Sequence, residues 1–576
     1  MADVAEESVD LLVLGAGCAG MTAAITAAAH GLRVLVAEKA AHVGGTTAYS
    51  AGTAWVPGTD HVARAGLSDT VGDAARYLDW IAGEEDPRGR RDAFLRTGAE
   101  AIRFLEAHSE LRFILPALAP DYRDGPGSVA AGRALVAAEY DGRRLGRDLA
   151  LIRPPRPGFT VLGGMMVGKP DVDALLRPFG SLAAFRRAVA ILGRHARDRL
   201  SHARGTRLVM GNALVARLLA SLRALDVPLR TGTRAERLLL REGRVEGAIL
   251  LAPDGRRIAV RAASGVVLAT GGFSGSPSWR ARLLAPAPAG DLTVACADDA
   301  GDGFDLAAEA GAAPDAAGQG TGAFWMPTSV RHGRDGATAF PHIILDRAKP
   351  GVVLVNARGE RFVNEGLSYH DVVLAMFGNG GDGPDEPAWL VCDSAFLRRY
   401  GLGLIRPGAL SWRSFRRDGY LVSAPTLREL ALRIGVSPGG LEATIARHDG
   451  FAGTGVDAEF GKGSTRLNRQ NGDPGRGGPN PCLAPIAVPP FHAVSVRPAD
   501  LATAAGLPTD ADGRVLRPDG GAVSGLYAVG NDAASIMRGT YPGPGTTIGP
   551  ALVFGYRAGR HVVGERRARS GERAPS

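Results

Sequence analysis

The stretch DLLVLGAGCAG, residues 10–20, decides the fold of this chain. It begins as a short apolar strand and then fits the pattern G-x-G-x-x-G, from Gly15 to Gly20. A helix is predicted over residues 18–30 and a second strand over residues 32–39. The glycines permit a tight turn, close approach of a pyrophosphate and close packing of helix on strand. Because the helix N-terminus also supplies free N–H groups and a positive dipole end, the stretch predicts a dinucleotide-binding βαβ unit.

A carboxylate ends the second strand, and three glycine-rich turns follow farther along the chain. At the position of Glu38 a carboxylate accepts hydrogen bonds from adenosine ribose hydroxyls, whereas an NADP site favours arginine. The turns are GGTTAYSAG (residues 44–52), ATGG (269–272) and GN (530–531). Their order along the chain is typical of FAD-binding proteins. Because no second G-x-G-x-x-G lies between a strand and a helix, we expect no tightly held nicotinamide cofactor.

The expected FAD contacts gather on these turns and on the strand ends beside them. His42 alone is weak evidence for a covalent flavin link, so FAD is expected to bind non-covalently. No metal site is expected. The residues expected to contact FAD are Gly15, Ala16, Gly17, Cys18, Ala19, Gly20, Glu38, Lys39, Gly44, Gly45, Thr46, Thr47, Ser50, Ala51, Gly52, Ala235, Thr270, Gly271, Gly272, Asp302, Gly530, Asn531, Thr547 and Ile548.

Length and composition set the broad class. With 576 residues the chain is too long for one simple core, so two or three domains are expected. Hydrophobic residues make up 45% and charged residues 22%, and no run approaches the ~20 apolar residues of a membrane span. The acidic N-terminus lacks the regions of a secretory signal, which favours a cytoplasmic protein. Four scattered cysteines without CxxC spacing argue against zinc, an iron–sulfur cluster and a disulfide framework.

The net charge of +8 raises the question of an anionic partner. The basic residues are spread among Ala, Gly and Leu without interleaved aromatic residues, so no nucleic-acid binding is expected. The densest basic patch, residues 185–207, predicts an amphipathic helix with a cationic face. A solvated charged face is the preferred interpretation, with peripheral membrane contact as the most that this patch would support.

The predicted fold class is α/β, with a discontinuous Rossmann-like FAD-binding domain and an inserted α+β catalytic cap domain. Residues 1–320 form the first part of the FAD-binding domain, with an extended insertion at about 125–206. Residues 321–490 form the substrate cap, and residues 491–576 complete the FAD-binding domain and end in a frayed tail. The active site is then expected between the two domains.

Three tyrosines stand in loops or at the ends of predicted elements. Tyr122 lies in a Pro- and Gly-rich loop, Tyr369 follows a strand-like stretch at residues 351–364, and Tyr541 begins YPGPGTTIGP at residues 541–550. From the pattern alone, each is most simply a half-buried aromatic residue with a satisfied hydroxyl group.

The chain also resembles a known family over nearly its whole length. The similar stretches are GGTTAYSAGTAWVPG (44–58), PDY (120–122), MGNALVARLLASL (210–222), NEGLSY (364–369) and GNDAASIMRGTYPGPGTTIGPALVFGYRAG (530–559). They resemble the 3-oxosteroid (3-ketosteroid) 1-dehydrogenases, within the fumarate reductase/succinate dehydrogenase flavoprotein superfamily. The stretch 125–206 is longer than in the compact members and would reshape the mouth of the substrate site.

The resemblance implies a role for each tyrosine and for one glycine. Tyr541 and the Gly545 N–H would hydrogen-bond the C3 carbonyl oxygen and stabilise the developing enolate. Tyr369 would take the proton from C2 with Tyr122 hydrogen-bonded to it, and the C1 hydride would pass to flavin N5, which leaves a C1–C2 double bond. The substrate would be a 3-ketosteroid or a similar apolar cyclic ketone, with a quinone as electron acceptor. A free tyrosine has a pKa of ~10 and burial raises it, so a tyrosinate base needs donors around it or acts as a relay.

Three alternatives stay open. A sibling dehydrogenase that forms a C4–C5 double bond, or that acts on another cyclic ketone, would use the same flavin and similar tyrosines. A fumarate- or urocanate-type reductase would carry an arginine where this chain has Gly545-Thr546-Thr547, and a histidine near Tyr541; neither is expected here. A non-catalytic flavin carrier would have no need of all three tyrosines together with Gly545.

Overall fold

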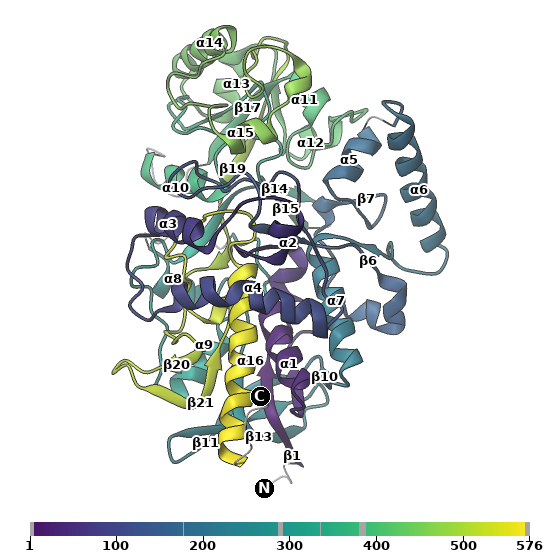
Figure 1. Ribbon diagram of the computed structural model, residues 1–576. Helices are drawn as coiled ribbons and strands as arrows, with labels where there is room; N and C mark the ends of the chain where they lie inside the picture. The colour runs from purple at the N-terminus through teal and green to yellow at the C-terminus, as the bar shows by residue number, and fades with distance from the viewer. Residues whose placement is uncertain (1–4, 177, 286–291, 335, 380–386, 571–576) are drawn as a thin grey trace.

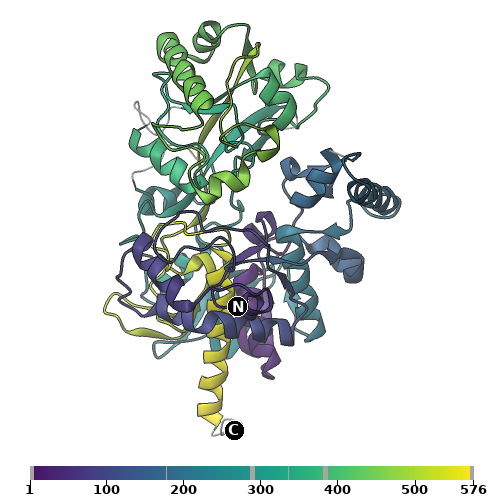
Figure 2. The same ribbon diagram turned by 45° about the horizontal axis from the view of Figure 1, so that its top comes forward.

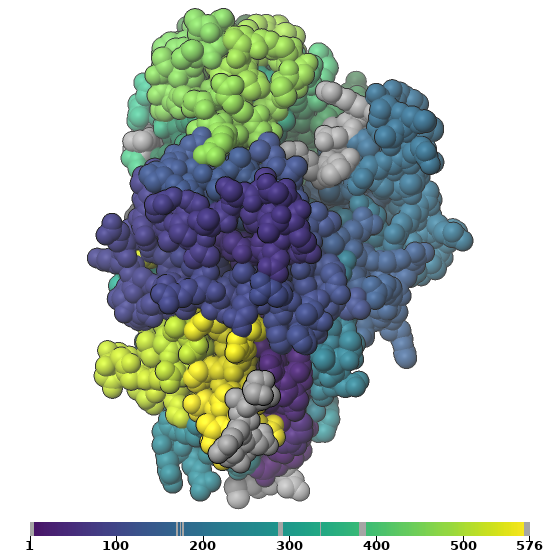
Figure 3. Space-filling view, in the orientation of Figure 1, coloured from purple at the N-terminus to yellow at the C-terminus, as the bar shows by residue number. Residues whose placement is uncertain are grey.

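The computed structural model describes residues 5–176, 178–285, 292–334, 336–379 and 387–570. Figure 1 shows two bodies stacked along the long axis of the molecule, with the start of β1 (Ala5–Leu14) and the end of α16 (Ile548–Ser570) at the foot of the lower one. On the face drawn in Figure 3, the dark-blue N-terminal third of the chain covers the region between the upper body and the C-terminal helix.

An eight-stranded sheet forms the centre of the lower body. The strands follow the order β10-β2-β1-β13-β12-β11, and β21 pairs with both β13 and β20. β1 runs parallel to β2 and to β13, as a βαβ unit requires. The bounds are β1 Ala5–Leu14, β2 Val34–Ala37, β10 Leu229–Arg230, β11 Arg234–Arg241, β12 Arg244–Leu251, β13 Arg257–Leu268, β20 Arg514–Leu516 and β21 Ala522–Ala528.

The turn from β1 into helix α1 (Cys18–Ala29) has room only for glycine at two positions. Gly15 has a φ of +108°, and a Cβ there would lie 2.1 Å from the Ala269 carbonyl oxygen. A Cβ at Gly20 would lie 2.1 Å from the Gly15 carbonyl oxygen. The first glycine therefore brings β1 against the end of β13, and the second brings the helix against its own turn.

The C-terminal helix α16 (Ile548–Ser570) packs along α1, as Figure 1 shows. The approach is close because α16 presents glycine: a Cβ at Gly555 would lie 2.6 Å from the Ala19 carbonyl oxygen. Residues 563–570, expected in a frayed tail, instead continue this helix. Residues 571–576 of the expected tail lie outside the described part of the chain.

A six-stranded sheet organises the upper body. The order is β15-β14-β19-β17-β16, with β18 paired to β19. β19 pairs with β14 and β17 of this sheet, although the predicted domain boundary at residue 490 falls just before it. The division into residues 1–320, 321–490 and 491–576 stays a prediction. The bounds are β14 Ala323–Gly333, β15 Gly336–Pro341, β16 Val352–Val355, β17 Ala388–Asp393, β18 Val422–Ala424 and β19 Phe491–Thr503. Helix α10 (Tyr369–Asn379), which begins at a candidate site residue, packs on β14.

The stretch predicted as an insertion carries a short hairpin and two helices that project to the side (Figure 2). The hairpin is β7 (Thr160–Val161) and β8 (Met165–Met166), and the helices are α5 (Lys169–Leu176) and α6 (Leu182–Asp198). The amphipathic helix expected over residues 185–207 is α6, which ends at Asp198, so residues 199–207 are not helical. The helix exposes Leu182, Phe185 and Val189 as well as arginines. The solvated charged face expected there is therefore wrong in part. No helix in the described residues is long and apolar enough to cross a membrane.

Candidate active site

One cavity extends from the ends of β1 and β2 to the three tyrosines. Its wall includes all four catalytic candidates, Tyr122, Tyr369, Tyr541 and Gly545. The FAD candidates on its wall are Gly15, Gly17, Cys18, Ala19, Glu38, Lys39, Gly44, Gly45, Thr46, Thr47, Ser50, Ala51, Ala235, Thr270, Gly271, Asp302, Gly530, Asn531, Thr547 and Ile548.

The other four FAD candidates, Ala16, Gly20, Gly52 and Gly272, do not line the cavity. Ala16 acts through its backbone, because its N–H donates to Glu38. A Cβ at any of the three glycines would lie within 2.4 Å of another part of the chain. These glycines therefore permit close packing of the loops behind the cavity wall.

Glu38 occupies the position just after β2 that the ribose contact requires. Its carboxylate accepts the N–H of Ala16 at 2.8 Å and that of Ala40 at 2.9 Å. Burial raises the pKa of this carboxyl, and the two backbone hydrogen bonds act in the opposite direction. Each oxygen keeps a second lone pair, which can accept a hydroxyl group.

The start of α1 offers donors for phosphate. Gly17 precedes the helix and has no side chain that could cap its N-terminus. Thr47 accepts the Cys18 N–H at 3.2 Å and joins this turn to the second glycine loop. The first-turn N–H groups and the helix dipole can therefore stabilise an anion in the cavity.

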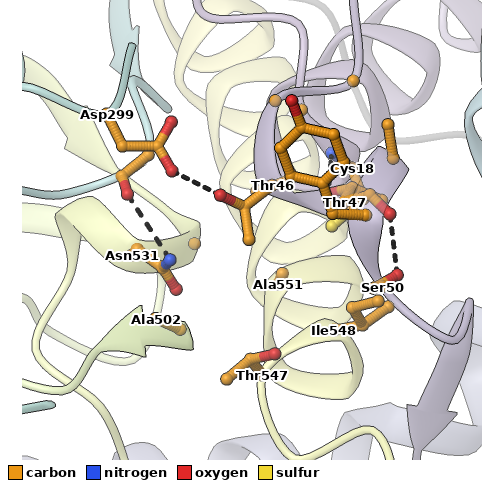
Figure 4. Close-up of a pocket in the computed structure, with 18 of the residues that line it drawn as sticks. Cys18, Thr46, Thr47, Ser50, Asp299, Ala502, Asn531, Thr547, Ile548 and Ala551 are labelled. Carbon is orange, nitrogen blue, oxygen red and sulfur yellow. Dashed lines mark hydrogen bonds between the residues drawn. The ribbon is translucent and has the colours of Figure 1, made fainter. Parts of the chain in front are cut away.

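The opposite wall is held together by hydrogen bonds among side chains and turns (Figure 4). Thr46 donates to Asp299 at 2.6 Å and accepts the Cys296 N–H at 2.7 Å. Asn531 donates to the Gly271 carbonyl oxygen at 3.4 Å. Burial holds the pKa of Asp299 well above its usual range. A glycine-lined cradle with a carboxylate just after β2, a helix start whose N-cap is glycine, and polar walls fits FAD.

Tyr122, Tyr369 and Tyr541 meet at the other end of the cavity. The Tyr122 hydroxyl donates to that of Tyr369 at 3.4 Å, and their rings are edge to face with centroids 5.6 Å apart. The Tyr541 ring stacks on Tyr122 at 5.8 Å and meets Tyr369 edge-on at 5.0 Å. Burial raises the pKa of all three, to about 12 for Tyr541.

Gly545 turns the chain back toward the cavity four residues after Tyr541. Its φ is +94°, and a Cβ would lie 2.5 Å from the Thr53 carbonyl oxygen. Its carbonyl oxygen accepts the N–H of Trp55 at 3.1 Å and of Gly549 at 2.9 Å. Within the described residues nothing accepts its own N–H, which leaves this donor available beside Tyr541.

A histidine distant in sequence fixes the Tyr541 loop. His370 Nε2 lies 2.8 Å from the Gly539 carbonyl oxygen, and the Trp325 N–H donates to its Nδ1 at 3.2 Å. This pattern assigns the proton to Nε2. Burial lowers the pKa of His370, so the ring is neutral. It positions the loop, and its one ring proton is held by the Gly539 carbonyl oxygen.

Sequence reasoning missed much of the apolar wall and several charged residues. Met166, Met210, Met326, Ile343 and Leu501 line the cavity. No local pattern separates such residues from ordinary core residues. Arg153, Arg156, Asp298 and Asp299 also line it. The acidic run at residues 298–302 was the one signal that could have pointed to the last two.

Comparison with known proteins agrees with this geometry. The FAD binding domain family matches residues 10–548. The chain is 38% identical over 562 residues to 4-oxocyclohex-2-ene-1-carboxylate 5-dehydrogenase of Sinomonas cyclohexanicum, covering 96% of this chain and 93% of that protein. It is 36% identical over 569 residues to 3-oxosteroid 1-dehydrogenase of Mycobacterium tuberculosis, covering 96% and 98%.

A solved structure gives the same answer for the whole chain. The 3-ketosteroid delta1-dehydrogenase from Sterolibacterium denitrificans, in complex with 1,4-androstadiene-3,17-dione, matches with a TM-score of 0.89 and 31% identity. The match covers 97% of this chain and 100% of that one. The chain therefore belongs to the 3-oxosteroid 1-dehydrogenase family of FAD-dependent oxidoreductases.

Proposed function

We propose that this protein is an FAD-dependent 3-ketosteroid dehydrogenase that introduces a C1–C2 double bond. The observation that carries the proposal is the meeting of Tyr122, Tyr369 and Tyr541 in the cavity that also fits FAD. The apolar wall beyond them suits a large hydrocarbon ring system. Bound FAD supplies the hydride acceptor, and the protein supplies binding, orientation and proton transfer.

The ketone oxygen is bound by Tyr541 and by the free Gly545 N–H. Both donors act where negative charge develops as the enolate forms, and both lie in a buried site where such hydrogen bonds are strong. Burial raises the pKa of Tyr541 to about 12, so its hydroxyl stays protonated and donates at neutral pH.

Tyr369 is the base for the C2 proton. Its hydroxyl contacts that of Tyr122, which can donate to a tyrosinate or pass the proton on. Burial opposes ionisation of Tyr369, and the proximity of the other two tyrosines adds to that effect. The base therefore needs a compensating interaction or acts as a relay.

A second candidate is a desaturase of a small cyclic ketone that carries a carboxylate. Two relatives, at 38% and 35% identity, are dehydrogenases of 4-oxocyclohex-2-ene-1-carboxylate and 4-oxocyclohexanecarboxylate. Arg156 lines the cavity, and within the described residues no carboxylate pairs with it. The Arg156 guanidinium lies over the Tyr49 ring, 4.5 Å from its centroid, and would supply the positive charge that a substrate carboxylate needs.

Anaerobic mixing distinguishes the two. Bleaching of the flavin by a 3-ketosteroid, with a C1–C2 double bond in the product, supports the first proposal. A C4–C5 product would identify the sibling reaction, and bleaching only by 4-oxocyclohexanecarboxylate would establish the second candidate. The Tyr541→Phe variant should retain FAD and slow the reduction by orders of magnitude. A quinone acceptor and a cytoplasmic location complete the proposal, and both rest on the resemblance and the sequence.

A further inference from the structure

A buried arginine lies behind the proposed base. Arg347, in the loop after β15, is 0% exposed. Its guanidinium donates to four backbone carbonyl oxygens, at His342, Ile343, Glu365 and Leu367. Two of these carbonyls precede Tyr369 by four and two residues. The side chain therefore ties the loop before Tyr369 to the loop that carries Ile343, a cavity residue.

This cation has no carboxylate on its guanidinium within the described residues. The Asp346 carboxylate is bonded to His342 at 2.6 Å and to the Gly403 N–H at 3.2 Å, and it meets Arg347 only at the backbone N–H. The Glu365 carboxylate pairs with Arg361 at 2.8 Å and lies 3.4 Å from Lys462. Both carboxylates favour the charged form of Arg347 through space, but neither is hydrogen-bonded to its guanidinium.

The charge on Arg347 acts on the tyrosines. It lowers the pKa of Tyr122, against the larger effect of burial, and both Tyr122 and Tyr369 in turn favour the charged arginine. Desolvation lowers the pKa of Arg347 to about 10, which still leaves it charged at neutral pH. Of the groups around the tyrosine pair, Tyr541 has the opposite effect on Tyr122 and Tyr369. Arg347 is therefore a buried cation that favours ionisation of Tyr122, which is hydrogen-bonded to the proposed base.

We propose that Arg347 is a positioning residue for proton abstraction, which holds the Tyr369 loop and stabilises the tyrosinate form of the Tyr122–Tyr369 pair. The proposal rests on the function proposed above. In the step, the C2–H bond breaks, the proton goes to the tyrosinate oxygen, and the electron pair remains on the enolate held by Tyr541 and Gly545. Because the tyrosinate fraction rises tenfold for each unit by which the pKa falls, a nearby cation speeds this step below the pKa.

The test compares Arg347→Met with Arg347→Lys by anaerobic flavin bleaching with a saturating 3-ketosteroid, from about pH 6 to 10. The rate of bleaching should rise with pH as tyrosinate forms, and we call this part of the profile the rising limb. We expect Arg347→Met to shift the rising limb to higher pH by at least about one unit, which lowers the rate at neutral pH about tenfold. Arg347→Lys keeps the charge, so its limb stays near that of the wild type. In a Tyr369→Phe background, Arg347→Met should add no further loss.

Arg217 supplies the matched control. It is 9% exposed and also donates to backbone carbonyl oxygens, at Ala138, Glu110 and Glu139, but no tyrosine of the site contacts it. Arg217→Met should leave the position of the limb unchanged. A limb that stays in place in Arg347→Met while the rate falls evenly at every pH would reduce Arg347 to a structural residue and overturn the proposal.

Two further measurements keep the outcome decisive. If Arg347→Met loses FAD, Arg347→Gln replaces it, because glutamine also lacks the charge but retains two donors. If none of the ketones bleaches the flavin of the wild-type protein, that result contradicts the proposed function but not the role of Arg347. Ultraviolet difference titration of tyrosinate, with Tyr369→Phe as reference, then still shows whether Arg347→Met raises the pKa of the pair. An unchanged titration would sink the inference.

Discussion

The hydroxyl oxygens of Tyr122 and Tyr369 lie 3.4 Å apart, although 247 residues separate them in the chain. Tyr122 comes from the N-terminal third and Tyr369 from the start of α10 beside the six-stranded sheet. Tyr541, from the loop before α16, stacks on the first ring. The proposed base and oxyanion donors therefore form one site only where three distant segments meet, next to a cavity wall that fits FAD.

The first prediction concerns this pair. Tyr369→Phe removes the base and should slow substrate-dependent flavin reduction by about 100- to 10,000-fold, the range expected for loss of a positioned proton acceptor. Tyr122→Phe leaves the base in place and should have a smaller effect that grows as the pH falls, because tyrosinate loses a donor. Stopped-flow absorbance measures both. Equal rates in wild type and Tyr369→Phe would contradict the assignment.

Gly545 gives the second prediction. Gly545→Ala places a Cβ 2.5 Å from the Thr53 carbonyl oxygen at a φ of +94°, so the loop must move and the free N–H with it. Loss of one such donor should slow flavin reduction by about 100-fold or more. Gly564→Ala, in α16 with no heavy atom within 4 Å of the new Cβ, should retain activity and slightly raise the melting temperature. A fully active Gly545→Ala variant would exclude the oxyanion role.

Glu38 gives the third. The two oxygens of its carboxylate each accept a backbone N–H group. In Glu38→Gln one of these oxygens becomes an NH₂ group, which then faces a donor that it cannot accept. The resulting mismatch costs about 1–3 kcal/mol, which weakens FAD binding by about 5- to 150-fold. Titration of apoprotein with FAD measures this. Glu84→Gln, at an exposed position outside the cavity, should bind FAD as the wild type does. Equal affinities in the two variants would remove Glu38 from the site.

The βαβ unit and its glycine cradle were predictable because their signals are local. A glycine at a strand end, a helix period and a carboxylate after the second strand all lie within residues 10–38. The meaning of a single glycine was not predictable. Gly44 lines the cavity while Gly20, from the same kind of motif, packs against the chain, since glycine admits a ligand and a neighbouring backbone equally well.

The rest of the site depends on contacts that no sequence window contains. The tyrosines were assigned through family resemblance, whereas their pattern alone favoured three half-buried rings with satisfied hydroxyl groups; the structure buries all three. Arg347 and Ile343 gave no signal, because a buried arginine that binds only carbonyl oxygens follows no spacing rule. The outer face of α6 was misread in part because charge is visible in sequence, whereas the exposure of Leu182 and Val189 follows from how the helix docks.

The last prediction is a pH dependence set by Asp532. This carboxyl is 0% exposed and accepts the N–H groups of Thr270 and Gly272 and the Thr270 hydroxyl, and no cation among the described residues is bonded to it. Burial raises its pKa to about 6, and the hydrogen bonds only partly offset that effect. Its pKa in the unfolded chain is ~3.9, so the folded state binds the proton more tightly.

The contribution of Asp532 to the free energy of unfolding is therefore full below about pH 4 and is lost as the pH rises through about 6. This contribution is on the order of 3 kcal/mol. Denaturant unfolding of the FAD-loaded protein at several pH values across this window measures the slope. Asp532→Asn should flatten it, whereas Asp519→Asn, in an exposed turn, should leave it unchanged. A slope as steep in Asp532→Asn as in the wild type would mean that Asp532 is already ionised below this window, held by the Thr270 and Gly272 N–H groups and the Thr270 hydroxyl.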